Sequence, residues 1–140
     1  MIKDGLKMSG HVKIALNDEV VKEIPNLVVT DGKKWVADRM NDANTVMSHM
    51  AVGTGTTAAA AGDTTLDTEE DRNALTSTTV TDNEVAYVCS WASGDATASL
   101  TEAGLFDASS GGDMLARTVF SVVNKGASDS LTITWTITVS

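Results

Sequence analysis

The chain has 140 residues, which predicts one domain large enough to bury a hydrophobic core without disulfides or a structural metal. Its 19 acidic and 10 basic side chains give a formal net charge of −9, which disfavours direct binding to nucleic acid or to an anionic membrane. Cys89 is the only cysteine, so an internal disulfide and a zinc site built from several thiolates are both excluded. No apolar run approaches the ~20 residues of a membrane span.

The first ten residues are predicted to form an N-terminal arm in front of a single domain that comprises residues 11–140. Lys3, Asp4 and Lys7 stand where a signal peptide has its apolar segment, so synthesis in a reducing cytosol is expected. Residues 1–40 also hold seven of the ten basic side chains, so we expect this third of the chain to meet any acidic partner surface.

Apolar side chains in such an arm stay in water unless they dock on a partner. A frayed terminus is the alternative interpretation of the arm. The candidate partner interface consists of Met1, Ile2, Leu6 and Met8.

Alternating apolar and polar residues predict at least six strands, and the clearest lies at 131–139. Every odd position of that segment is apolar and every even position is threonine, so one face is buried and the other is wet. Residues 114–123 break the alternation, which indicates a strand covered on both faces or a bulge. The other predicted strands are residues 11–16, 46–52, 85–91 and 99–106, with 19–24 and 76–81 as weaker candidates.

One short helix is predicted from Thr30 or Asp31, either of which suits an N-cap, through Met40. A second, weaker helix is expected around 67–75, where acidic side chains would stabilise the positive end of a helix dipole. Glycine, threonine and alanine fill residues 53–62, and this composition predicts an exposed loop.

Short turns join several of these strands, including Asn17-Asp18 and residues 109–113, and strands joined in this way run antiparallel. About eight antiparallel strands and one short helix predict an all-β fold. The architecture expected is a β-sandwich of jelly-roll type, with the immunoglobulin type as the other candidate.

No group of residues predicts catalysis, a cofactor or a metal. His11 and His49 lie on the polar faces of their strands, and no further histidine or cysteine stands at metal-binding spacing. Cys89 shares a face with apolar neighbours, which favours burial over reactivity. The acidic run Asp67, Glu69, Glu70 and Asp71 lacks the ligand spacing and the glycine of an EF-hand loop. We therefore do not expect an enzyme.

Four segments resemble small structural proteins of tailed bacteriophages: residues 29–37 (VTDGKKWVA), 50–57 (MAVGTGTT) with 63–66, 102–106 (EAGLF) and 114–120 (MLARTVF). The closing LTITWT at 131–136 adds to the likeness. Among these proteins, size and β content are most similar to the jelly-roll cement, or head-decoration, proteins.

This resemblance implies a non-enzymatic protein on the outside of the capsid, which bridges and braces subunits of the major capsid protein and often forms a dimer. It also implies synthesis in the cytoplasm of a bacterial host. Related segments also occur in tail, baseplate and fibre-attachment modules, which are the first alternative. A small carbohydrate-binding jelly roll is the second, although Trp35, Trp91 and Trp135 all lie on apolar faces of their predicted elements.

Overall fold

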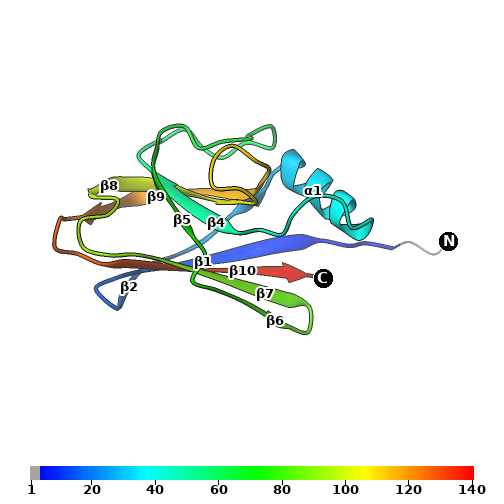
Figure 1. Cartoon of the computed structure of the whole chain (residues 1–140), viewed down its shortest axis with the longest axis horizontal. Helices are drawn as coiled ribbons and strands as arrows, with labels where there is room; N and C mark the ends of the chain where they lie inside the picture. Colours follow the sequence, from blue (N-terminus) through cyan, green and yellow to red (C-terminus); the bar gives the residue numbers. More distant parts are fainter. Residues whose placement is uncertain (1–3) are drawn as a thin grey trace.

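The computed structural model describes residues 4–140 and contains ten strands and one helix. Two five-stranded antiparallel sheets pack face to face, which confirms the predicted all-β sandwich (Figure 1). The elements are β1 (Met8–Leu16), β2 (Glu19–Pro25), β3 (Leu27–Val28), α1 (Thr30–Met40), β4 (His49–Gly53), β5 (Glu69–Ala74), β6 (Ser77–Thr81), β7 (Glu84–Trp91), β8 (Ala98–Phe106), β9 (Met114–Lys125) and β10 (Leu131–Val139).

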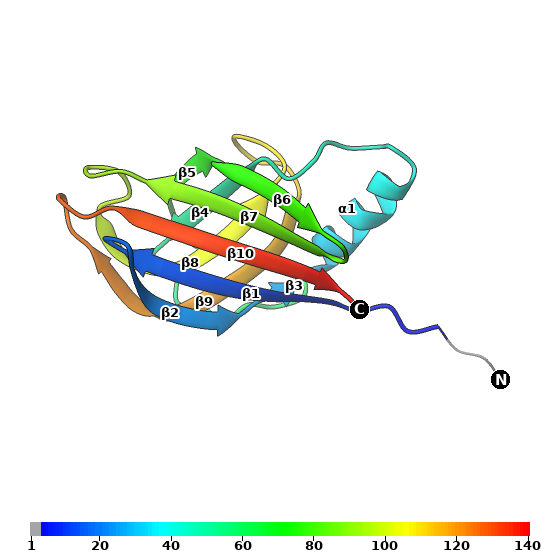
Figure 2. The same cartoon turned by 90° about the horizontal axis from the view of Figure 1, so that it is seen from below.

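The first sheet has the strand order β2-β1-β10-β7-β6, so the first long strand and the last strand of the chain are neighbours (Figure 2). The strict alternation of β10 is confirmed residue by residue, because Leu131, Ile133 and Trp135 point into the core while the threonines between them are half-buried. Asn17 and Asp18 turn β1 into β2 with φ values of 51° and 67°, the left-handed pair that a two-residue hairpin requires.

The second sheet has the strand order β3-β9-β8-β4-β5 and is covered on both faces. Its inner face packs on the first sheet, and a second apolar cluster lies on its outer face: Val29, Ala51, Leu66, Phe106 and Met114. The pairing of β8 with β9 also shifts register between Leu100 and Glu102. Both explanations for the broken alternation of residues 114–123 therefore apply.

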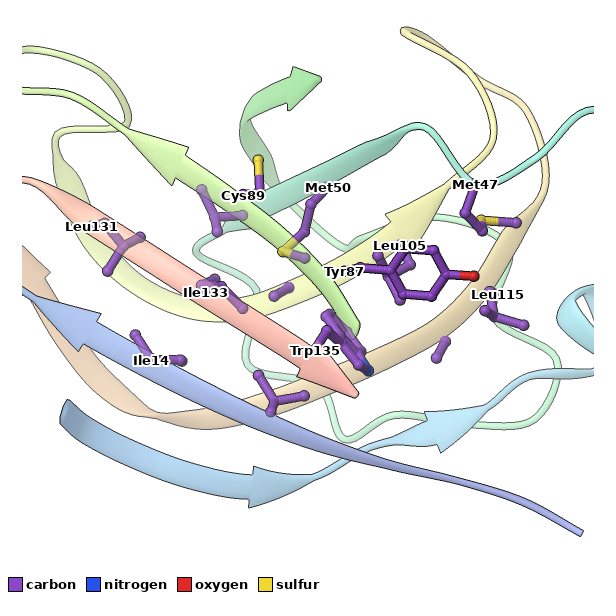
Figure 3. Close-up of a cluster of buried hydrophobic side chains, with 14 of the residues drawn as sticks. Ile14, Met47, Met50, Tyr87, Cys89, Leu105, Leu115, Leu131, Ile133 and Trp135 are labelled. Atoms are coloured by element: carbon purple, nitrogen blue, oxygen red, sulfur yellow. The ribbon is translucent and has the colours of Figure 1, made fainter. Parts of the chain in front are cut away.

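The main core fills the space between the sheets (Figure 3). Trp91 and Trp135 have no exposed surface, and Tyr87, Met47 and Leu105 belong to the same cluster. Cys89 is fully buried in this core, as its strand position predicted. Such dense packing of large side chains accounts for the stability of the sandwich without a disulfide.

Helix α1 lies across one end of the sandwich and spans the predicted residues, but its predicted N-cap is wrong. Val29 occupies the N-cap position and makes no side-chain cap. Asp31 instead accepts a 2.8 Å hydrogen bond from the backbone N–H of Met114 and so ties the helix to β9. Trp35 is buried, and its indole N–H donates to the carbonyl of Thr45 at 2.7 Å.

The second helix expected around residues 67–75 is wrong, because this segment forms the edge strand β5. β4 pairs with residues 69–74 over its whole length, and this ladder of backbone hydrogen bonds outweighs the local helix preference. Arg72 further fixes β5 by stacking 3.7 Å from the centre of the Phe106 ring.

The predicted loop at 53–62 is exposed only in part. Gly53 and Gly55 are buried, whereas the residues from Thr56 to Ala58 are exposed. A Cβ atom on Gly55 would lie 2.4 Å from Oε2 of Glu102, so only glycine fits there. The first residues of the segment therefore pack against the second sheet, and most of the residues that follow are exposed.

Candidate partner-binding surface

A groove of about 580 Å³ lies at the end of the sandwich where the chain enters. The N-terminal segment supplies Leu6 and Met8 to one side, the link between β2 and β3 supplies a second side, and α1 supplies the third. We call it the arm groove; its principal lining residues are Leu6, Met8, Leu27, Val28, Lys33 and Val36.

The described part of the predicted arm is joined to the sandwich at Lys7. The backbone N–H of Lys7 donates to the carbonyl of Ser140 at 2.7 Å, and Ser140 N–H returns a bond of 2.8 Å to Lys7. Strand β1 already begins at Met8, opposite Val139, so residues 8–10 of the expected arm belong to the sheet. Residues 4–6 leave the body beside the C-terminus (Figure 2).

The structure separates the four predicted interface residues. Leu6 is 78% exposed and lines the arm groove. Met8 lines it too, but packs partly against the main core. Met1 and Ile2 lie outside the described residues. Leu6 is therefore the predicted interface residue whose side chain is free to be buried by a partner.

Asn26 lines the arm groove and also contacts the core. Its Oδ1 accepts a 2.6 Å hydrogen bond from the indole N–H of Trp135, while its Nδ2 is buried without a partner among the described residues. A Cβ atom at Gly10 would lie 1.5 Å from this Oδ1, so a larger residue on this strand would displace the Asn26 side chain from its bond to Trp135. The contact fixes the link between β2 and β3, and with it one wall of the groove.

A buried ion cluster that the sequence did not predict holds residues 54–68 against the second sheet. We call these residues the 54–68 cover. Glu102 and Arg117 are both fully buried, and the guanidinium Nη2 of Arg117 lies 2.9 Å from Oε1 of Glu102. Arg117 also pairs with Asp63 at 2.9 Å and Asp67 at 3.4 Å. Two strands and the covering loop therefore meet at one guanidinium.

Backbone amides complete this cluster. The N–H groups of Gly55, Asp67 and Thr68 donate to the carboxylate of Glu102 at 2.7, 2.9 and 2.8 Å. Burial alone lowers the pKa of Arg117, but its hydrogen bonds to Glu102 and Asp63 outweigh burial and raise that pKa overall. Because its donors and acceptors are engaged in this way, the cluster has a structural role: it holds residues 54–68 against β8 and β9.

The other predicted candidates lie apart from one another. His11 is exposed and sits 3.2 Å from Glu23, whereas His49 is half-buried beside Ser48. In the acidic run, Asp67 pairs with Arg117 and the remaining acids lie along β5.

No group of three or more potential metal ligands occurs within residues 4–140. No helix in that range is long and apolar enough to cross a membrane. Comparisons of the chain with protein-family models, with curated proteins and with solved structures found no match.

Proposed function

We propose that this chain is a non-enzymatic structural protein of a tailed-phage particle, a cement protein on the outside of the capsid. Its partner would be the major capsid protein, whose neighbouring subunits it bridges. The likeness of five sequence segments to phage structural proteins motivates this proposal, and the observation that carries it is the exposed Leu6 at the arm groove.

Leu6 and the arm groove provide the apolar contact that such a role needs. Burial of a leucine side chain on a partner contributes about 1.5–3 kcal/mol, and the groove offers Val28 and Val36 as further apolar surface. Lys33 lines the same groove and gives it a positive charge for an acidic partner surface. Many copies on a symmetric shell turn a modest single contact into stable decoration.

The carbohydrate-binding alternative would need an exposed aromatic ring on which a sugar can stack. All three tryptophans, Tyr87, Phe106 and Phe120 are buried, so none offers a ring on which a sugar can stack. A tail or baseplate module would use the same arm groove, and location in the particle separates it from a cement protein.

A pair of matched variants tests the proposal. Leu6→Glu places a charge at the arm groove, and Met40→Glu makes the same type of change at an apolar residue that is 86% exposed and outside the groove. Binding of the purified chain to capsids that lack it should weaken roughly tenfold or more for Leu6→Glu, and stay unchanged for Met40→Glu. Equal binding by both variants would contradict a contact at Leu6.

A further inference from the structure

The described part of the chain has four strands at sheet edges, and three of them carry features that block pairing with another molecule. β2 contains Lys22, Glu23 and Pro25, and β3 has only two residues before α1 begins. β5 begins with Glu69, Glu70, Asp71 and Arg72 and has a register shift in its pairing. Charges, proline, short length and bulges are the usual protections of an edge.

β6 has none of these protections. Its sequence, Ser77-Thr78-Thr79-Val80-Thr81, has no charge, proline or glycine, and it pairs with β7 without a register shift. All five residues are exposed, and Val80 is 69% exposed. Within residues 4–140, no side-chain hydrogen bond reaches this strand, so its outer row of N–H and C=O groups is open.

We propose that β6 is a self-association surface, where it pairs antiparallel with β6 of a second copy of this chain. Thr79 would lie on the two-fold axis, opposite its own counterpart. Thr78 would then face Val80 twice, and Ser77 would face Thr81. Each of these pairs joins small, uncharged side chains, and most are β-branched, which suits cross-strand packing.

The lack of charge on β6 permits a second copy to bind at this edge. Two chains that each carry −9 repel one another, so a contact between them requires an uncharged region. In the proposed register, Asp82 of one copy would face Thr76 of the other, so no acidic side chain would face another. The edge can therefore pair with itself without placing two charged side chains opposite each other.

The proposed pairing also sets the directions of the two arm grooves. Three successive antiparallel pairings, β1 with β10, β10 with β7 and β7 with β6, place Met8 at the Thr81 end of β6. A two-fold axis at Thr79 would put the Leu6 ends at opposite ends of one ten-stranded sheet. Such a dimer would present two separated contacts, as a bridging protein requires; this last step rests on the proposed function.

Sedimentation velocity on the full chain tests the pairing without any particle. The wild-type chain should sediment with twice its 14.6 kDa mass. Thr79→Lys places two like charges opposite each other on the axis and should weaken self-association roughly tenfold or more. Thr97→Lys, the same change in an exposed loop, should leave the dimer intact.

A cross-link gives a second, independent readout. Cysteines opposite each other in antiparallel strands meet disulfide geometry, so Thr79→Cys should yield a covalent dimer on mild oxidation, and Thr97→Cys should not. Cys89 is buried and does not compete. A wild-type monomer up to its solubility limit, a Thr79→Lys dimer of unchanged strength, or a Thr79→Cys dimer that fails to cross-link would each overturn the proposal. None of these results depends on binding to a capsid, so they are separate from the test of Leu6.

Discussion

The indole N–H of Trp135 donates a 2.6 Å hydrogen bond to Oδ1 of Asn26, and this bond connects the centre of the core to the wall of the arm groove. Trp135 has no exposed surface, so its N–H has no access to water and depends on this acceptor. The position of the groove wall is therefore coupled to the packing of the core.

Loss of this acceptor should destabilise the fold. Asn26→Ala leaves a buried indole N–H unsatisfied, so we expect its free energy of unfolding to fall by about 1–3 kcal/mol. Trp135→Ala removes the whole side chain and should cost about 3–5 kcal/mol. Urea denaturation measures both changes, with Asn41→Ala, at an exposed position, as the control. A urea denaturation curve for Trp135→Ala that matches the wild type would contradict the assignment of Trp135 to the buried face of β10.

Removal of one partner from the buried ion cluster should release the 54–68 cover. Arg117→Met leaves the Glu102 carboxylate buried without its counter-charge, and such a change typically costs about 3–5 kcal/mol. Lys34→Met, which removes only an exposed ion pair with Asp38, should leave the free energy of unfolding nearly unchanged.

Hydrogen exchange locates the effect of Arg117→Met. The amides of Gly55, Asp67 and Thr68 donate to Glu102, so they should exchange faster in this variant than in Lys34→Met. Unchanged protection of these three amides would show that the cover is held by other contacts.

The turn between β9 and β10 should respond to acid through Asp129. Hydrogen bonds from Asn17 and from the backbone N–H of Gly126 lower the pKa of this carboxyl from its ordinary value of 3.8. A lowered folded-state pKa stabilises the fold above the unfolded-state pKa, and the gain disappears as pH falls through the folded-state pKa.

Asp129→Asn should therefore be less stable than the wild type at neutral pH, and the difference should shrink towards zero below pH 3.8. Asp95→Asn, at an exposed position whose side chain makes no hydrogen bond among the described residues, is the control. Thermal melts from neutral to acidic pH measure the difference. A gap between Asp129→Asn and the wild type that is independent of pH would rule out the carboxylate as its source.

Cys89 should be inert in the folded chain. Burial raises the pKa of its thiol to about 12, so at pH 8 the thiolate fraction is roughly one in ten thousand. Labelling with an alkylating reagent should therefore be slow for the native chain and complete in denaturant, as mass spectrometry would show. Rapid labelling of the native chain would mean that the core opens near β7.

Much of the fold was predictable because strand periodicity reports burial directly. The alternation of β10 predicted its bounds and its buried face, and Asn17-Asp18 predicted the first hairpin. β5 was mistaken for a helix because its polar residues show no period of two. Its strand conformation comes from pairing with β4, a contact between segments that are distant in the sequence. No local pattern of residues predicts such a contact.

The candidate surface was predictable only in part. Exposed apolar residues in the arm indicated Leu6, but α1 and the link between β2 and β3 complete the groove through contacts between distant segments. Glu102 and Arg117 each stand alone in an apolar run, and this was the signal that a buried ion pair existed. Only the pairing of β8 with β9 places them on one face.

Cryo-electron microscopy of phage particles purified from the cells that carry the gene for this chain tests the proposed function most directly. We predict density for the sandwich on the outer surface of the capsid, with Leu6 and the arm groove against the major capsid protein. Density for the chain in the tail or baseplate, or particles that do not contain the chain, would contradict the proposed function.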